Sequence, residues 1–371
     1  MAIVNRMYNE FKIVRDGLAR AIHRRKFILR DINAQKKALK DYVSDIKEVI
    51  SGDPLNSDVF CIFIYYEPQD LVSRSVQRAL SELREQNVNV ILAVNHNLTD
   101  AQLAYFKANC YAVILRGNQG FDFGGYKDVI RYMKERRVEP SRLIIMNDSL
   151  FFGSAGLREM ISRLLGPEDV ISSYENWSGA EHHHLQSFCI SLSDYVYRSQ
   201  SFEKFWRDYI PINNRIFAIE QGEKKLSAAL LAYARTTHVV FSTSMLHDAL
   251  LKEEVPFREE LFTLPQPWRV WIDQADNSKP YEHLVRMIAE LVNSTSPIHA
   301  GAYYFPKMLK SPLLKKDLVY RHRFDFWEVE RWAPRILSED EVEEYLTILR
   351  KKGDENKLSK TDIAKYRIGA K

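Results

Sequence analysis

Val59-Phe-Cys-Ile-Phe-Ile-Tyr65 is an uninterrupted apolar run in which every residue but the cysteine is β-branched or aromatic. A run of this kind is typical of a strand that is buried on both faces, as in a parallel sheet. The stretch before it, Ser51–Ser57, contains Gly, Pro, Asn and Ser, which predicts a linker. We therefore expect the first buried strand of the fold at residues 59–65.

Helical and strand patterns alternate after this run. The predicted elements in chain order are a helix over 69–86, a strand over 88–94, a helix beginning at Thr99, a strand over 111–115, a helix within 120–137 and a strand over 143–146. Alternation at this spacing predicts an α/β fold with a Rossmann-type, mostly parallel sheet and helices on both faces. The second half is less regular, with strands predicted at 170–174, 185–192 and 239–242 and helices at 201–209, 220–235, 284–292 and 338–351.

The first 50 residues are predicted to be helical because apolar residues recur at steps of three and four between Val4 and Ile22. They carry 12 Lys and Arg against 6 Asp and Glu. A basic amphipathic helix can lie on an anionic membrane surface. It can equally pack on the body of the protein or pair with another subunit, and both alternatives stay open.

The composition narrows the class of protein. The chain has 371 residues, 46% hydrophobic and 27% charged, as in an ordinary globular protein. A net charge of +4 does not indicate nucleic-acid binding. Its three cysteines form no CxxC pair, which indicates buried thiols in a reducing compartment. No signal peptide or bilayer-spanning apolar run is visible, so a cytoplasmic location is expected.

A glycine-rich stretch follows the third predicted strand, Arg116-Gly-Asn-Gln-Gly-Phe-Asp-Phe-Gly-Gly-Tyr-Lys-Asp128. Glycines let a backbone approach a ligand closely, and the first N–H groups of a helix attract phosphate. The fourth predicted strand ends in the polar triplet Asn147-Asp-Ser149. Ligands of open α/β sheets bind at such carboxyl ends. Walker-type, GxSxG and HExxH motifs are all absent, and the pattern suggests a sugar-nucleotide site.

Several motifs in this order resemble the rhamnan synthesis F family of bacterial glycosyltransferases. The motifs are Asn118–Lys127, Ile144–Ser149, His184–Ser187, Phe202–Trp206, Glu220–Glu223 with Leu226 and Ser227, and Ser311–Lys316. The resemblance covers roughly residues 57–320. It implies a glycosyltransferase-A type fold and a nucleotide-activated deoxysugar donor such as dTDP-rhamnose, used at the cytoplasmic face of the membrane.

The resemblance suggests a division of the chain. Residues 1–52 are the basic extension, 53–160 the donor-binding half, 161–335 the acceptor-binding and catalytic half, and 336–371 a C-terminal helix with a polar tail. The residues predicted to bind the donor are Tyr65, Arg116, Asn118, Gly120, Asp122, Gly124, Lys127, Asn147 and Ser149. Arg116 or Lys127 would meet the diphosphate, Asp122 a hydroxyl group, and Tyr65 with its neighbours the base.

Asp148 occupies the position where the implied fold usually places an acidic motif that holds a divalent cation. One carboxylate with phosphates and water can hold Mg²⁺, and Mn²⁺ is the other candidate. The alternative is that Asp148 caps the next turn. For Asp122 the alternative is the N-cap of the helix that follows.

Inverting transfer needs a general base for the acceptor hydroxyl group. Glu220 is the first candidate, His184 the second, and Gln186 and Ser187 are predicted to contact the acceptor. The triplet His182–His184 cannot converge on one metal, because neighbours on an extended chain point to opposite faces. Trp268 and Trp271 are candidate sugar platforms, and Trp206 is expected in the core. Lys315 and Lys316 are expected on a solvated basic face, and contact with phosphate is the alternative.

These observations predict a hexosyltransferase, rhamnosyltransferase-like, that extends a cell-surface polysaccharide, O-antigen or lipopolysaccharide on a lipid-linked or polysaccharide acceptor. A non-catalytic sugar-nucleotide-binding or scaffold protein of an assembly complex is one alternative. Transfer of a sugar phosphate is another. Nucleic acid is not an expected partner, and residues 1–50 are the segment expected to contact a membrane surface or a second copy of the chain.

Overall fold

The structure is a computed structural model that describes residues 26, 28–67, 71–177, 183–252, 263–265, 280–293, 295–321 and 323–353. Its centre is an eight-stranded sheet with the strand order β1-β4-β3-β2-β5-β10-β7-β11. The strands of this sheet are β1 (Ile46–Ser51), β2 (Val59–Tyr65), β3 (Asn89–Val94), β4 (Ala112–Arg116), β5 (Arg142–Asn147), β7 (Val170–Ser172), β10 (Cys189–Ser193) and β11 (Thr237–Val239). Two small antiparallel pairs accompany it: β6 (Leu150–Phe152) with β12 (Leu313–Lys315), and β8 (Glu175–Trp177) with β9 (His183–Leu185).

The first half of the sheet confirms the predicted doubly wound arrangement. β4, β3, β2 and β5 are neighbours and run parallel, and β2, the first of these four in sequence, lies between β3 and β5. This is the order in which ligand crevices form at the carboxyl ends of the strands. β10 then pairs antiparallel with β5 and β7.

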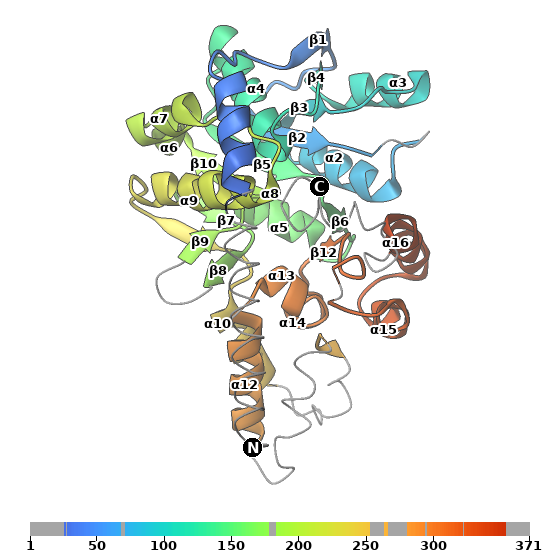
Figure 1. The fold of residues 1–371 in the computed structure, drawn as a ribbon. Helices are drawn as coiled ribbons and strands as arrows, with labels where there is room; N and C mark the ends of the chain where they lie inside the picture. Colours follow the sequence, from blue (N-terminus) through green and yellow to red (C-terminus); the bar gives the residue numbers. More distant parts are fainter. Residues whose placement is uncertain are drawn as a thin grey trace, which may run out of the picture.

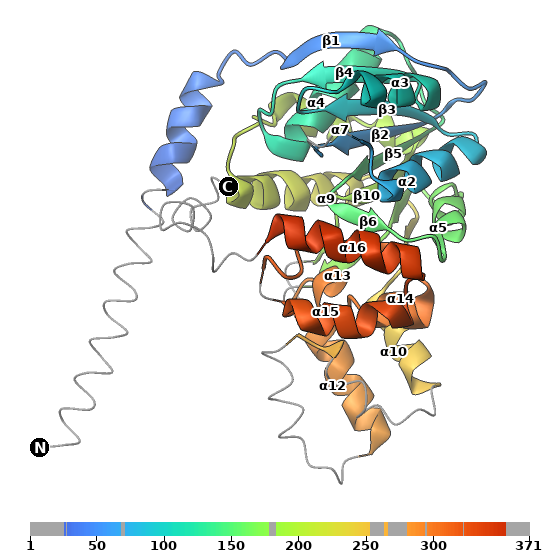
Figure 2. The same ribbon diagram turned by 90° about the vertical axis from the view of Figure 1, so that its right-hand side faces the viewer.

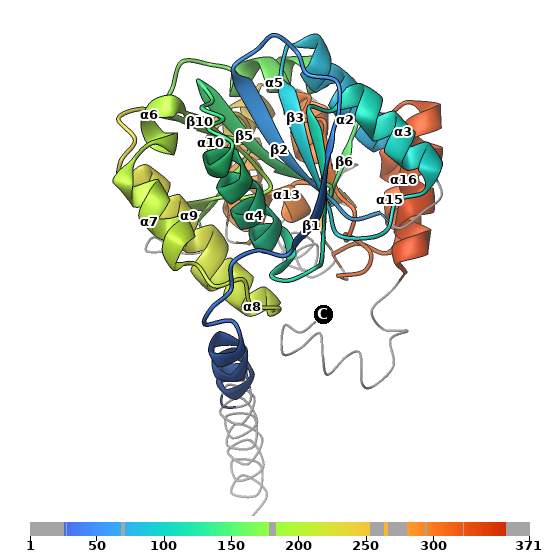
Figure 3. The same ribbon diagram turned by 90° about the horizontal axis from the view of Figure 1, so that it is seen from above.

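The helices cover both faces of the sheet, as expected (Figure 1). Their bounds are α2 (Arg74–Glu85), α3 (Asp100–Asn109), α4 (Phe121–Glu135), α5 (Leu157–Leu164), α6 (Asp194–Tyr197), α7 (Gln200–Asp208), α8 (Arg215–Phe217), η1 (Ala218–Glu223, a π-helix), α9 (Lys224–Leu231), α10 (Thr243–Leu251), α12 (Tyr281–Asn293), α13 (Pro297–Ala300), α14 (Tyr304–Leu309), α15 (Phe326–Trp332), η3 (Ala333–Arg335, a 3-10 helix) and α16 (Glu339–Lys352). Seen from above, the strands lie between α4, α7 and α9 on one side and α2, α3 and α16 on the other (Figure 3).

Alternate residues of β2 serve two different cores, because successive side chains of a strand point to opposite faces. Cys61, Phe63 and Tyr65 belong to the cluster under α2, α5 and α16. Phe60, Ile62 and Ile64 belong to the cluster under α4, α7 and α9. Burial on both faces explains why the run is continuously apolar.

Capping residues set the starts of several predicted helices. Thr99 forms a capping box with Gln102 at the start of α3, and Ser338 forms one with Glu341 at the start of α16. Ser199 caps α7. α10 and α12 extend below the body of the molecule, while α16 crosses it beside α15 (Figure 2). Within the described residues, no helix combines the length and apolar character needed to cross a bilayer.

Some expected elements differ from the structure. The helix predicted over residues 1–50 is wrong at its end, where β1 pairs antiparallel with β4 at the sheet edge. Residues 28–38 are helical, whereas the apolar pattern from Val4 to Ile22 lies outside the described residues. The strand predicted over 185–192 is two strands, β9 and β10, and the strand predicted over 239–242 lies at β11 instead.

Candidate functional site

The carboxyl ends of β2 and β5 bring an acidic turn to the middle of the sheet edge. Asp148 follows β5, and its Oδ2 accepts a hydrogen bond of 2.8 Å from the backbone N–H of Tyr66, which follows β2. Asp148 is 9% exposed. The backbone N–H of Asp148 donates to the carbonyl of Ile64 at 3.0 Å. The turn is thus fixed against the end of the central strand.

Asn147 links this turn to the glycine-rich stretch. Its Nδ2 donates to Asp122 Oδ2 at 3.0 Å, and its Oδ1 accepts from the Ser149 hydroxyl at 2.6 Å. Asp122 lies in the first turn of α4, whose N-cap is Gly120, so Asp122 is not the cap. The structure therefore brings together three of the predicted donor-binding residues.

The β6–β12 pair carries two lysines to the same turn. Lys315 Nζ donates to Ser149 Oγ at 3.1 Å and lies 4.2 Å from the centre of the Phe188 ring. Lys316, which is 7% exposed, places Nζ 3.4 Å from Glu67 Oε1. The expectation that these lysines form a solvated basic face is wrong, because the short β12 strand inserts them beside the site.

A second polar group lies across from the turn and centres on Glu223, the last residue of the π-helix η1. Its Oε2 accepts hydrogen bonds from the Ser187 N–H at 3.0 Å and the Ser187 hydroxyl at 2.7 Å. Its Oε1 lies 3.3 Å from His184 Nε2 and 3.4 Å from Gln186 Nε2. All three residues predicted for the acceptor side thus surround one carboxylate.

Local backbone geometry explains why Glu223 points here. A π-helical segment inserts an extra residue per turn and shifts the following side chains, and such segments are frequent at functional sites. Gly222 lets the segment pack closely, because an added Cβ would lie 3.0 Å from the Phe123 ring. The chain in front of α9 is held against α4, and Glu223 faces β9 and β10.

Burial and neighbouring charges shift the acidities of these groups. Burial, with a further contribution from Asp148, raises the pKa of Asp122 to about 6. Burial also raises the pKa of Asp148, although Lys316 opposes this. Burial alone would raise the pKa of Glu223, but hydrogen bonding and charge from His184, with the Ser187 bonds, lower it. The lowered pKa keeps Glu223 ionised at neutral pH, which is the form that a general base needs.

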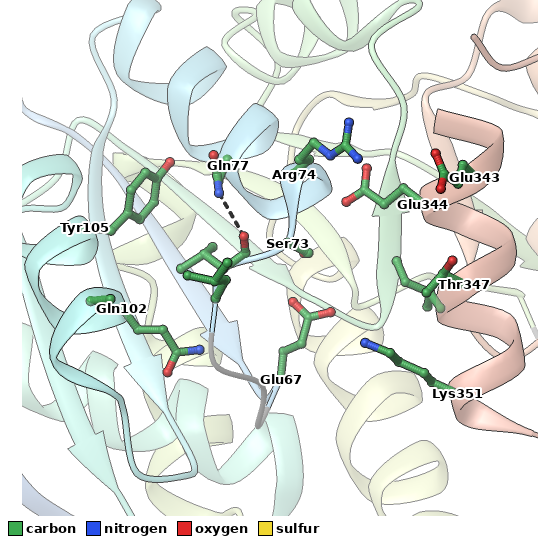
Figure 4. A pocket seen from close by; sticks show the side chains of 14 residues that line it. Glu67, Ser73, Arg74, Gln77, Gln102, Tyr105, Glu343, Glu344, Thr347 and Lys351 are labelled. Carbon is green, nitrogen blue, oxygen red and sulfur yellow. Dashed lines mark hydrogen bonds between the residues drawn. The ribbon is translucent and has the colours of Figure 1, made fainter. Parts of the chain in front are cut away.

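A cavity of about 530 Å³ opens beside Glu67, between α2, α3 and α16 (Figure 4). Its walls include Gln102 and Tyr105 from α3 and Thr347 and Lys351 from α16. Glu67 and Lys351 point toward one another from opposite sides of it (Figure 4). Glu67 Oε2 is buried and has no hydrogen-bond partner in the described part of the chain. An orphaned carboxylate oxygen at a cavity favours a ligand that brings a hydrogen-bond donor.

The remaining predicted donor residues have other positions. Arg116 is buried, with Nε donating to Asp128 Oδ2 at 2.8 Å and Nη1 to Asn95 Oδ1 at 2.8 Å. Lys127 donates to the carbonyls of Arg207 and Tyr209 at the end of α7. Tyr65 is fully buried among core side chains. These three side chains are committed to packing within the protein.

The glycines of the stretch serve close packing. Gly120 has φ +76°, and an added Cβ would lie 2.3 Å from the Pro211 side chain. A Cβ on Gly124 would lie 1.9 Å from the Gln119 carbonyl oxygen. The N–H of Gly120 already donates to Asn213 Oδ1 at 2.7 Å, while Asn118 is exposed in the turn before it. The space around Gly120 and Gly124 that was expected to bind phosphate is thus occupied by other parts of the protein.

Glu220, the predicted general base, is exposed and forms an i,i+4 ion pair with Lys224 at 2.7 Å. Glu223, three residues later in the same motif, was missed because sequence spacing alone does not reveal a π-helix. Trp206 is 4% exposed, which confirms the prediction that it packs in the core. Trp268, Trp271 and His182 lie outside the described residues.

The turn at Asn147–Ser149 offers few ligands for a divalent cation. Among the described residues, no group of three or more His, Cys, Asp or Glu side chains is arranged to hold a metal. Asp148 contributes one carboxylate, and one of its oxygens is already occupied by the Tyr66 N–H. Both polar atoms of the Asn147 side chain are bonded to Asp122 and Ser149. This donor set does not fit a resident metal.

Comparison with known proteins confirms the family resemblance for the central part of the chain. Residues 90–262 match the family of rhamnan synthesis protein F. The uncharacterized protein y4gN from Sinorhizobium fredii is 28% identical over 226 residues, which cover 56% of this chain and 58% of y4gN. The chain therefore spans less than two thirds of the length of that relative.

Solved structures show only distant likeness. The mannosyltransferase PcManGT from Pyrobaculum calidifontis, solved with GDP-Man and Mn²⁺, is 11% identical and has a TM-score of 0.33, with 95% of this chain and 96% of that chain covered. Residues 1–349 of TarS from S. aureus are 11% identical, with a TM-score of 0.32 and coverage of 79% of this chain and 90% of that one. At these values the likenesses carry no argument about the reaction.

Proposed function

We propose that this chain, whose residues 90–262 match the rhamnan synthesis protein F family, is an inverting glycosyltransferase that uses a nucleotide sugar. The observation that carries the proposal is that Lys315 links two polar groups: it donates to Ser149, it lies over the ring of Phe188 next to Ser187, and the Glu223 carboxylate acts on its pKa. Asp122, Asn147 and Ser149 lie on the donor side, and the ionised Glu223 with His184, Gln186 and Ser187 lies on the acceptor side.

The donor would occupy the carboxyl edge of the sheet. The cavity beside Glu67 is large enough for a nucleobase and ribose, and its unpartnered carboxylate oxygen supports recognition of a base N–H group. From there the diphosphate would reach the Asn147–Ser149 turn. Asp122 would then accept a hydrogen bond from a sugar hydroxyl group. In this arrangement residues 53–160 supply most of the donor site, and Lys315 from 161–335 and α16 from 336–371 also contribute to it.

The reaction requires one bond to form and one to break at the anomeric carbon. Glu223 would accept the proton of an acceptor hydroxyl group as its oxygen bonds to that carbon. The bond from the carbon to the diphosphate oxygen breaks, and its electron pair leaves with the nucleoside diphosphate. A deoxysugar such as rhamnose from dTDP-rhamnose is the donor we propose, and a lipid-linked or polysaccharide acceptor of the cell surface is the acceptor.

Substitution of Glu223 tests this function. We expect Glu223→Gln to lower sugar transfer by about 10²–10⁴-fold, the range for removal of a general base, while donor binding is retained. Glu220→Gln is the matched control, because Glu220 belongs to the same motif but is exposed. The measurements are product formation from a panel of nucleotide sugars and the shift in melting temperature that each donor causes.

The outcomes separate the alternatives. Loss of transfer in Glu220→Gln with full transfer in Glu223→Gln would overturn the assignment of the base. Nucleotide binding without turnover by the wild type would support a binding or scaffold protein. A phosphodiester product would identify a sugar-phosphate transferase, because the sugar would then move together with its phosphate.

We propose a cytoplasmic location, on the inner face of the membrane where the acceptor is made. The described end of the basic extension packs on the body: Ile32 is 9% exposed, and Gln35 Oε1 accepts from the Asn213 N–H at 2.8 Å. This supports a packing role for residues 28–38. Sedimentation with anionic vesicles would test membrane contact by the whole extension.

A further inference from the structure

We infer that the ammonium group of Lys315, in place of a divalent cation, neutralises the diphosphate of the donor. The inference rests on the proposed function, and it assigns to one side chain the task that the implied fold usually gives to a metal. Three features support it: the groups that already contact Asp148, the position of Lys315, and the N–H groups of its ammonium that have no acceptor among the described residues.

Asp148 already has partners that would compete with a metal ion. Its Oδ2 accepts from the Tyr66 N–H at 2.8 Å, and among the charged groups around it Lys316 has the largest effect on its acidity. A cation already stands beside the carboxylate that a metal would need. Mg²⁺ demands a nearly ideal octahedron of oxygen ligands, and this turn leaves it little more than one carboxylate oxygen. A lysine needs no such geometry.

Lys315 lies beside the turn proposed to bind the donor. It reaches the donor turn through Ser149 Oγ at 3.1 Å, and the acidic groups that act on it most strongly are Asp317, Glu223 and Asp122. Its ammonium group is therefore bonded to the donor turn and close enough to the carboxylate proposed as the base to be affected by its charge. The leaving diphosphate must occupy this region if Glu223 is to reach the acceptor on the opposite side of the anomeric carbon.

Lys315 has more N–H groups than hydrogen-bond partners among the described residues. An ammonium group has three N–H donors. In the part of the chain that the structure describes, the Lys315 ammonium group donates one hydrogen bond, to Ser149 Oγ. Its Nζ lies 4.2 Å from the centre of the Phe188 ring. Two donors are left to reach phosphate oxygens. In a partly buried site, where water screens charge weakly, such a contact gains strength as negative charge develops on the leaving group.

Burial lowers the pKa of Lys315, and the carboxylates of Asp317, Glu223 and Asp122 act against this lowering. The net shift of the pKa is downward, so these carboxylates offset only part of the effect of burial. A bound diphosphate would add negative charge beside the ammonium group and favour its charged form. The side chain is held ready by acidic neighbours before the donor arrives, so little reorganisation is needed on binding.

The experiment is a calorimetric titration of dTDP, UDP and GDP into the full chain, in EDTA and again with excess Mg²⁺ or Mn²⁺. We expect the preferred diphosphate to bind the wild type in EDTA, and its affinity to change less than about threefold when metal is added. Lys315→Met keeps the aliphatic chain on Phe188 and should bind at least about tenfold more weakly, as expected for loss of a charged hydrogen bond. Lys315→Arg should recover part of this loss.

Lys47→Met is the matched control, because Lys47 is exposed on the edge strand β1. Its affinity should equal that of the wild type. Binding by the wild type only when metal is present would overturn the inference and leave the proposed function standing. Wild-type affinity in a folded Lys315→Met would overturn it as well. If no nucleoside diphosphate binds in either condition, the proposed function fails together with the inference.

Discussion

Asp122 is a carboxyl group whose charged form is disfavoured by the folded protein. Burial and the nearby Asp148 raise its pKa from 3.8 to about 6, and Lys315 offsets only part of this. The folded state thus binds the proton more tightly than the unfolded chain does. The free energy of unfolding falls as pH rises from about 4 to about 6, and above that range the folded state carries the whole penalty.

Asp122→Asn removes this penalty and keeps a side chain that can accept from Asn147. We expect the variant to be more stable than the wild type at pH 7.5, by about 1–2 kcal/mol after allowance for partial exposure. The difference should shrink toward pH 4. Melting curves at both pH values measure it, and donor binding by the variant should weaken. A less stable variant at pH 7.5 would show instead that Asp122 is needed for folding.

Single residues also mark the limit of what the sequence predicts. Asn147, Asp122 and Ser149 are close together because parallel strands end at one edge, and that edge follows from the strand pattern. Lys315 comes from a three-residue strand whose residues pair with β6 residues 161 to 165 positions away, and no local pattern indicates such a pairing. Its approach to Ser149 is a tertiary contact.

At the scale of elements, Arg116 joins β4 to α4. Its guanidinium group and the Asp128 carboxylate are both fully buried, and the Tyr42 hydroxyl also donates to Asp128 at 2.9 Å. Arg116, at the end of β4, was expected to face a phosphate. In the structure it faces Asp128, a carboxylate of the following helix α4. The glycines at 120 and 124 let the helix start close enough for this pair to form.

Arg116→Met should therefore act on stability. It leaves Asp128 buried without its cation, and we expect a loss of about 3–5 kcal/mol in the free energy of unfolding. Arg131→Met removes an exposed ion pair with Glu135 on the same helix and an exposed hydrogen bond to the Val43 carbonyl, and should cost about 1 kcal/mol. Urea denaturation compares the two. An Arg116→Met protein of normal stability that no longer binds the donor would restore the prediction that Arg116 contacts the diphosphate.

Elements of the first half were predictable because burial on both faces makes their strands apolar throughout. β1 was not predictable, because each of its faces is only partly covered and its sequence, IKEVIS, shows no clear hydrophobic periodicity. The π-helix η1 was not predictable either, because its residues Ala218–Glu223 are compatible with an ordinary helix. That one difference in winding separates Glu220 from Glu223 as the candidate base.

At the scale of the whole molecule, α16 completes the cavity beside the sheet. Glu344 Oε1 accepts from the Ser75 N–H at 2.8 Å, and Glu344 Oε2 from Arg78 at 3.0 Å. Glu341 accepts from the Ser154 N–H at 2.6 Å. These contacts fix the helix over α2 and β6, so that Thr347 and Lys351 face Glu67.

Thr347→Trp should fill this cavity from the α16 side. We expect it to weaken binding of the preferred nucleoside diphosphate by about tenfold or more with little change in melting temperature, because Thr347 is exposed. Thr347→Ala, which adds no bulk at the same position, should bind normally. Unchanged binding by a folded Thr347→Trp would place the base elsewhere.

The docking of α16 also has a consequence for biosynthesis. Ser75 and Glu344 are 269 residues apart in the chain, so the wall that faces Glu67 leaves the ribosome long after the central strand has formed. At about 5–20 residues per second this delay amounts to tens of seconds. During that time the nascent chain has the edge of its sheet without the helix that encloses it. If the proposed donor binds in this cavity, translation products that stop before α16 should not retain it and should not compete for the cell's supply of donor.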